Sequence, residues 1–292
     1  MYHSKEIEIK SDLYKKSAII YGDKSVSLKA VIFYLHGGGL LYGRKEDLPS
    51  RHIEALTGAG YLIIALDYPL APAVKLPKIM QDIAHSINGY CKDCTVYLSD
   101  FTKHPDKKLP FFLWGRSSGA YLSLLLAAKG FLKEKPTGVL SYYGYGFLVD
   151  GWYQNESAYY KTLPQVPASC LNALPDKPHA DGDLATHYSV YVYARQTGTW
   201  KDLIYEGRDK HFLLDYSLRV DEKLPCSLFA AHSTGDTDVP YQEFIALCNR
   251  YQPRRFIAPG KEHDFDRDSE SEQTAKLLEA TIAFLNAKIP AK

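Results

Sequence analysis

The chain has 292 residues, of which 46% are apolar, 24% charged and 13% aromatic. This composition is typical of a folded globular protein and excludes disorder as the main state. Lys and Arg number 35 against 34 Asp and Glu, a net charge of +1, and no run of one sign marks a nucleic-acid-binding surface. No apolar stretch reaches the roughly 18 residues that a membrane span requires.

The N-terminus and the cysteines indicate the compartment. The first residues, 1–6, lack the apolar core of a signal peptide. The 5 cysteines are too few, and odd in number, for a disulfide framework. Cys91 and Cys94 form a C-x-x-C pair, but no second pair or neighbouring His completes a zinc ligand set. We therefore expect a cytoplasmic protein that needs no metal, binds no nucleic acid and does not span a membrane.

Apolar runs and glycine loops alternate in the first part of the chain. Residues 27–35 form an apolar run that ends at the tetrapeptide 36–39, His-Gly-Gly-Gly, and residues 60–66 form a second run. Both patterns predict buried strands that lead into loops. After Pro77, isoleucines recur every four residues, which predicts an amphipathic helix to about residue 90.

The same alternation continues to the C-terminus. The final helix is expected to begin at a capping box, Ser269-x-x-Glu272. Strands with continuous apolar runs, separated by helices, are typical of a mostly parallel sheet that is covered on both faces. The further strands are predicted at 109–114, 139–143, 227–231 and 254–258, and the further helices at 120–130 and 241–250.

Residues 145–225 interrupt this pattern. The segment has many tyrosines and no regular succession of strands and helices. A bare loop of this length is uncommon in a compact domain, so we expect a small helical insertion. The predicted division is a core of residues 1–144 and 226–292 with a cap over 145–225.

The strongest chemical signal is Gly115-Arg116-Ser117-Ser118-Gly119, a G-x-S-x-G motif between an apolar strand and a helix. A serine on so sharp a turn needs neighbours without side chains, and the turn lifts its hydroxyl above the edge of the sheet. The glycines at 37–39 would let backbone N–H groups approach a ligand oxygen, as in an oxyanion hole. Together the two motifs predict a serine nucleophile.

A serine nucleophile needs a base and an acid that orients the base. The loop after the strand at 227–231 contains Asp236 and Asp238, and the loop after the strand at 254–258 contains His263. Both loops lie beyond the carboxyl ends of strands, where open α/β sheets place their sites. His232 lies at a strand end before either acid, so we interpret it as structural.

These motifs resemble those of the α/β-hydrolase fold, most closely the hormone-sensitive-lipase-like esterases. The segment 68–73, Tyr-Pro-Leu-Ala-Pro-Ala, is similar to the family's Tyr-Arg-Leu-Ala-Pro-Glu. The elbow differs, because Arg116 and Ser118 stand where members commonly have Asp and Ala. The resemblance implies an oxyanion hole formed by the N–H groups of Gly37, Gly38 and Ser118. It covers the chain outside the insertion.

The resemblance also suggests the acid. The family's loop often reads D-x-x-V-P, and counting back from Pro240 gives Asp236, with Asp238 as the alternative. His263 lies in a Gly-x-x-His-Asp-Phe context similar to the family's last loop. The predicted triad is therefore Ser117, His263 and Asp236.

We thus expect a serine hydrolase that cleaves carboxylic esters, with short acyl chains, through an acyl-enzyme and without a cofactor. A serine peptidase or amidase of the same fold is one alternative. A catalytically silent relative that binds a ligand in the same pocket is another. The sequence identifies no substrate-binding residues, and a homo-oligomer is compatible with it.

Overall fold

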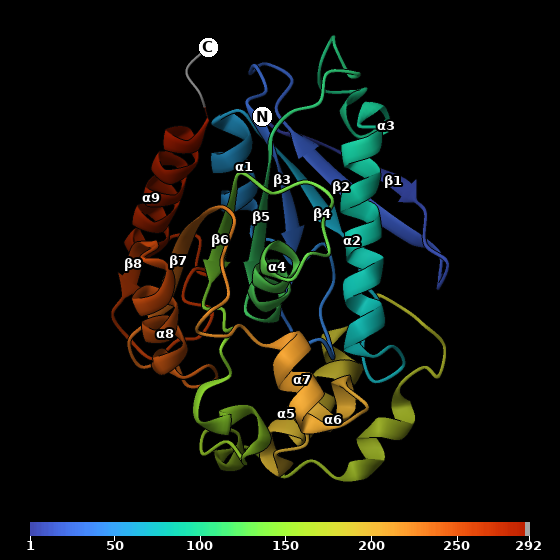
Figure 1. Ribbon diagram of the computed structural model, residues 1–292, viewed down its shortest axis with the longest axis vertical. Coiled ribbons are helices and arrows are strands. Elements are labelled where there is room, and N and C mark those ends of the chain that lie inside the picture. The colour runs from blue at the N-terminus through green and yellow to red at the C-terminus, as the bar shows by residue number, and fades with distance from the viewer. Residues whose placement is uncertain (290–292) are drawn as a thin grey trace.

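A computed structural model describes residues 1–289. An eight-stranded sheet in the order β1-β2-β4-β3-β5-β6-β7-β8 forms its centre. Strands β3 to β8 are parallel to one another, and β1 and β2 join one edge in antiparallel pairing (Figure 1). The strands are β1 His3–Ile9, β2 Lys16–Gly22, β3 Ala30–Leu35, β4 Tyr61–Leu66, β5 Phe111–Arg116, β6 Gly138–Tyr142, β7 Ser227–Ser233 and β8 Arg254–Ala258.

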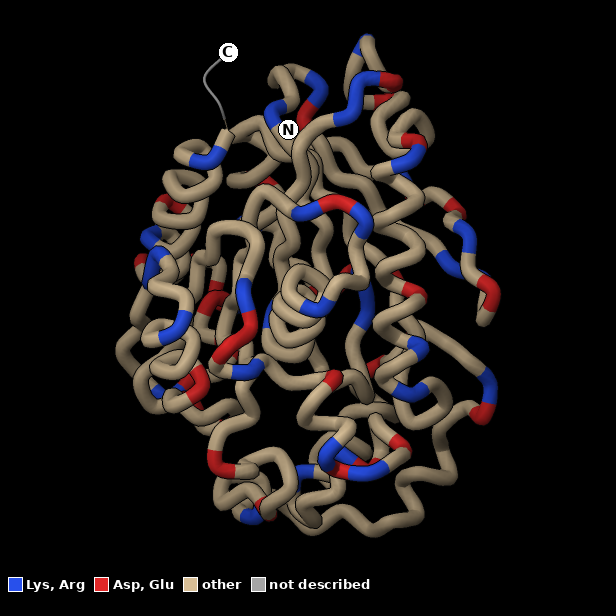
Figure 2. The backbone as a smooth tube through the Cα atoms, in the orientation of Figure 1, with Lys and Arg blue, Asp and Glu red and all other residues tan. Residues whose placement is uncertain are grey.

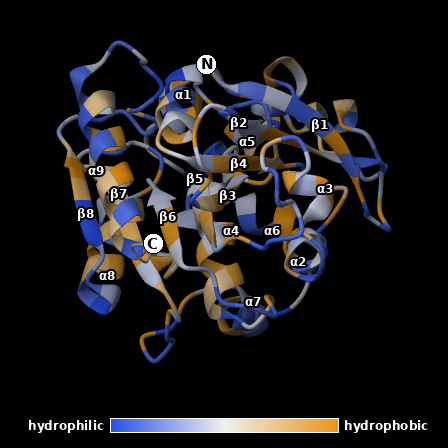
Figure 3. Cartoon of the chain, turned by 90° about the horizontal axis from the view of Figure 1, so that it is seen from above, coloured by the Kyte–Doolittle hydropathy of each residue, from blue (hydrophilic) through white to orange (hydrophobic). Residues whose placement is uncertain are grey.

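Helices cover both faces of the sheet because its central strands are apolar on both sides. On one face α2, α4 and α8 pack in one hydrophobic core, and on the other α1 and α9 pack in a second. Figure 3 shows the sheet crossing the view with α1 above it and α2, α4 and α8 below. The helices are α1 Ser50–Gly58, α2 Leu76–Lys92, α3 Thr95–Leu98, α4 Ser118–Ala128, α8 Tyr241–Tyr251 and α9 Glu272–Lys288. This architecture confirms the predicted α/β fold.

Short helices fill the segment between β6 and β7. They gather beyond the carboxyl ends of the parallel strands, at the bottom of Figure 1. Their aromatic side chains pack into the core that α2 and α4 share. The boundaries of a separate cap at 145 and 225 stay a prediction. The helices are η1 Val149–Gln154, η2 Tyr160–Thr162, η3 Ala168–Ala173, α5 Leu184–Thr197, α6 Trp200–Ile204 and α7 Asp209–Tyr216.

A buried carboxylate joins the start of this insertion to the core. Glu243, in the first turn of α8, is fully buried. Its oxygens accept hydrogen bonds from the backbone N–H groups of Gly146, Phe147 and Val149 and from the indole N–H of Trp152, at 2.7 to 3.0 Å. Four donors replace the water that the carboxylate loses on burial. The entry to the insertion is therefore fixed to α8.

The structure differs from the sequence-based expectation at several elements. Strands β1 and β2 and helix α1 were not predicted. The capping box at Ser269 is wrong: Ser271 caps α9, where its side chain accepts a hydrogen bond from the N–H of Gln273 at 3.2 Å. Strand β7 extends to Ser233, so His232 lies inside it.

Lys and Arg are interspersed with Asp and Glu along the tube in Figure 2. Within residues 1–289, no helix is long and apolar enough to cross a membrane, and no three metal-ligating side chains gather. Cys91 and Cys94 have free thiols, as do the other three cysteines.

Candidate active site

Ser117 lies at the turn between β5 and α4, with a backbone φ of 52°. Residues other than glycine rarely adopt this conformation, and its strain indicates a functional constraint. A Cβ atom on Gly115 would lie 2.0 Å from the carbonyl carbon of Gly119, and one on Gly119 would lie 2.0 Å from the carbonyl oxygen of Leu35. The glycines of the motif are therefore required by close backbone approach.

The structure brings Ser117, His263 and Asp236 together from three loops. The His263 Nε2 atom lies 2.9 Å from Ser117 Oγ, and its Nδ1 lies 2.7 Å from Asp236 Oδ2. The other oxygen of Asp236 accepts hydrogen bonds from the N–H groups of Asp238 and Val239 at 2.8 and 2.9 Å. This hydrogen-bonded chain has the geometry of a nucleophile, a base and an orienting acid.

Asp238 has different partners. Both of its oxygens lie 2.8 Å from the hydroxyl of Tyr191, and Oδ1 lies 3.3 Å from Arg195 Nε. It approaches His263 only at Nε2, at 4.0 Å. His232 is buried with its Nε2 3.3 Å from Asp236 Oδ2 and 3.1 Å from the carbonyl oxygen of Val239. His232 thus contacts the loop that holds Asp236 and Val239 and stabilises its position.

The carboxylates around His263 favour its protonated form. Burial of the imidazole lowers its pKa, but the charges of Asp236, Asp238 and Asp264 more than offset this and raise the pKa of His263 to about 9. Burial likewise raises the pKa of Asp236, and the two histidines beside it shift that pKa well below its ordinary value. Asp236 is therefore ionised at neutral pH.

The glycine loop lies against the serine. A Cβ atom on Gly37 would lie 3.4 Å from Ser117 Cβ, and Gly38 has a φ of 101°. Among the described residues, none accepts a hydrogen bond from the N–H groups of Gly37, Gly38 or Ser118. Tyr68 donates a hydrogen bond from its hydroxyl to the carbonyl oxygen of His36 at 2.9 Å and so supports the loop.

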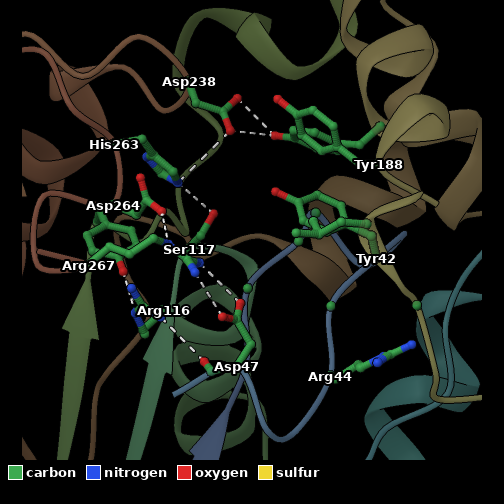
Figure 4. A pocket seen from close by; sticks show the side chains of 18 of the residues that line it. Tyr42, Arg44, Asp47, Arg116, Ser117, Tyr188, Asp238, His263, Asp264 and Arg267 are labelled. Atoms are coloured by element: carbon green, nitrogen blue, oxygen red, sulfur yellow. Dashed lines mark hydrogen bonds and ion pairs between the residues drawn. The ribbon is translucent and has the colours of Figure 1, made fainter. Parts of the chain in front are cut away.

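Ser117 opens into a cavity of about 730 Å³ between the sheet edge and the insertion. Figure 4 shows Ser117 and His263 on one side of this cavity and Tyr42 and Tyr188 on the other. Phenol rings offer apolar surface with a polar tip, so the pocket suits substrates that carry oxygen as well as carbon. The tyrosines that line it are Tyr42, Tyr143, Tyr159, Tyr160, Tyr188 and Tyr191.

A buried ion pair connects the serine and histidine loops. Arg116 Nη2 lies 3.0 Å from Asp266 Oδ1, which also accepts a hydrogen bond from the Tyr143 hydroxyl at 2.9 Å. Burial raises the pKa of Asp266, but Arg116 and His52 outweigh it and lower that pKa below its ordinary value. No local sequence pattern predicts this contact, because the partners lie 150 residues apart.

Residues 19–156 match the BD-FAE family model. A protein of unknown function from Staphylococcus aureus subsp. aureus Mu50 is 30% identical, with a TM-score of 0.81 over 99% of this chain and 100% of that one. An alpha/beta hydrolase superfamily protein from Enterococcus faecalis is 24% identical, with a TM-score of 0.75 over 96% and 99% of the two chains.

More distant comparisons agree in fold. Carboxyl esterase 2 from Tuber melanosporum is 18% identical, with a TM-score of 0.67 over 99% of this chain and 88% of that one.

Among curated proteins, the non-reducing polyketide synthase Preu3 from Preussia isomera is 26% identical over 170 residues. That match covers 56% of this chain but only 6% of the synthase.

Proposed function

Because the chain has the α/β-hydrolase fold, we propose that it is a serine hydrolase that cleaves carboxylic esters. The observation that carries the proposal is the chain of contacts of 2.9 and 2.7 Å that joins Ser117 to His263 and His263 to Asp236. These three side chains come from separate loops, and Ser117 and His263 line one cavity while Asp236 is buried behind His263. A hydroxyl, an imidazole and a carboxylate in this order are the groups that acyl transfer needs.

In the proposed mechanism the Ser117 oxygen attacks the ester carbonyl while His263 Nε2 accepts the hydroxyl proton. Asp236 holds the proton on Nδ1 and stabilises the imidazolium that forms. The N–H groups of Gly37, Gly38 and Ser118 stabilise the negative charge on the carbonyl oxygen. The alcohol leaves with the proton from His263, and water then releases the acid from the acyl-enzyme by the same steps.

A series of p-nitrophenyl esters from acetate to palmitate tests this proposal. We expect hydrolysis with the highest kcat/KM on short acyl chains, because a long alkyl chain would have to pack against the phenol hydroxyls that line the cavity. A fluorophosphonate probe should label Ser117. Faster hydrolysis of palmitate than of acetate would contradict the short-chain preference. Labelling of Ser117 without ester turnover would favour a peptidase. The absence of both labelling and ester turnover would favour a binding protein.

The pH dependence of the reaction follows from His263. Only the neutral imidazole accepts the serine proton, and the carboxylates raise the pKa of His263 from 6.5 to about 9. The value of kcat/KM should therefore rise with pH, falling about tenfold for each pH unit below that pKa. The measurement is kcat/KM on an aliphatic ester in a pH-stat at constant ionic strength. An acidic limb centred near the ordinary histidine pKa would contradict this prediction.

A further inference from the structure

A second carboxylate faces the reacting atoms from the wall of the cavity. Asp238 lies in the loop between β7 and α8, its side chain is 8% exposed, and it lines the cavity that holds Ser117. Figure 4 shows it above His263, with its oxygens directed to the imidazole and to the tyrosines of the insertion. The proposed mechanism does not use it.

The distance to His263 determines what Asp238 can reach. In acyl transfer the leaving oxygen takes its proton from His263 Nε2, so it lies about 3 Å from that nitrogen. Asp238 Oδ2 is 4.0 Å from the same nitrogen. A hydroxyl group on the second carbon from the leaving oxygen can therefore come within hydrogen-bond distance of Oδ2. An alkyl group in that position would leave the carboxylate without this partner.

The hydrogen bonds of Asp238 leave one oxygen available. Oδ1 receives the Arg195 Nε–H, while the single proton of the Tyr191 hydroxyl is shared between Oδ1 and Oδ2, 2.8 Å away on each side. Oδ2 has no other donor among the described residues, although a carboxylate oxygen can accept about two hydrogen bonds. Oδ2 is also the oxygen that lies 4.0 Å from His263 Nε2, and both residues line the cavity.

The partners of Asp238 also hold it still. Arg195 and Tyr191 both come from α5 of the insertion, and Arg195 donates a further hydrogen bond to the carbonyl oxygen of Asp238 at 3.1 Å. The guanidinium lies 4.8 Å from the centre of the Trp152 ring. A carboxylate oriented in advance loses little entropy when a ligand binds, and this favours selectivity.

We propose that Asp238 makes the site selective for esters of 1,2-diols, by accepting a hydrogen bond from the free hydroxyl group of the diol, on the second carbon from the leaving oxygen. The inference rests on the proposed ester hydrolysis and names the alcohol part of its substrate. The substrate class is that of polyol monoesters. The acyl part is not involved in this selectivity.

Three acetates test the proposal: 2-hydroxyethyl, 2-methoxyethyl and n-propyl acetate. The first two have similar inductive effects, but only the first has a donor, and the third matches the first in size. Wild-type protein should hydrolyse 2-hydroxyethyl acetate with a kcat/KM about tenfold or more above those of both others, the usual value of a hydrogen bond to a charged group. In Asp238→Ala the ratio of kcat/KM for 2-hydroxyethyl acetate to kcat/KM for 2-methoxyethyl acetate should fall to about one.

Tyr191→Phe is the matched control, because it removes the tyrosine hydroxyl but leaves the carboxylate and its contacts with Arg195 in place. Its ratio should stay clearly above one. The inference is wrong if the wild type shows no preference, if Asp238→Ala keeps it, or if both variants lose it equally. Should Asp238→Ala fail to fold, as judged by circular dichroism, Asp238→Asn should still reduce the ratio several-fold. An enzyme that hydrolyses none of the three acetates would contradict the proposed function itself.

Discussion

Replacing Ser117 by alanine should lower kcat on ester substrates by about 10⁵- to 10⁶-fold. The substitution removes the oxygen that attacks the carbonyl, and His263 is then left without a proton to accept. The hydrogen bond of 2.7 Å between His263 and Asp236 involves no atom of Ser117, so the remaining site should be preserved. The measurement is steady-state hydrolysis of p-nitrophenyl acetate, together with fluorophosphonate labelling, which should disappear.

A second serine-to-alanine variant, far from the site, controls for effects of substitution and purification that do not depend on the nucleophile. Ser99 is exposed at the end of α3, at the opposite end of the molecule from the insertion (Figure 1). Ser99→Ala should hydrolyse the ester and react with the probe like the wild type. If Ser117→Ala keeps more than about a hundredth of the wild-type kcat, another group supplies the nucleophile and the proposed mechanism is wrong.

Asp236→Asn should lower kcat by about 10⁴-fold without unfolding the loop. The amide oxygen can still accept the hydrogen bonds that Asp238 and Val239 donate to Oδ1. The amide N–H₂ then faces His263 Nδ1, where Oδ2 stood. Nδ1 must become the acceptor, so the imidazole proton moves to Nε2, and Nε2 can no longer take the proton of Ser117.

The matched comparison is Asp238→Asn, assayed on p-nitrophenyl acetate, whose leaving group has no hydroxyl next to the ester oxygen. Its loss of kcat should be at least about a hundred times smaller than that of Asp236→Asn, because Asp238 does not face Nδ1. Circular dichroism melting of both variants separates catalytic loss from unfolding. If the larger loss occurs in Asp238→Asn, Asp238 is the orienting acid.

The sequence predicted the parallel strands β3 to β8 and the loops that follow them, because both depend on local patterns. Apolar runs followed by glycine or polar loops give the carboxyl ends of strands, and parallel strands bring those ends to one edge. Ser117, Asp236 and His263 each follow such a run. Their convergence thus follows from the topology without knowledge of any side-chain contact.

The missing parts have two different physical origins. In β1, Ile7 and Ile9 alternate with Glu6 and Glu8, and this period-two pattern is typical of a strand with one buried face. The partners of Asp238 could not be found in this way. Tyr191 and Arg195 lie one helical turn apart on α5, within a segment whose tyrosines suit packing and pocket lining equally. Only the packing of the insertion shows which of them reach the cavity.

The ion pair between Arg116 and Asp266 has a consequence for how this chain can vary. Position 116 is one of the two positions that the G-x-S-x-G pattern leaves open, yet here its side chain is buried and paired with the opposite charge of Asp266, a residue after the histidine. A substitution at either position alone would leave the other buried charge without this partner and lower the free energy of unfolding by about 3–5 kcal/mol. The two positions should therefore covary among relatives, and any transplanted elbow must carry its histidine loop with it.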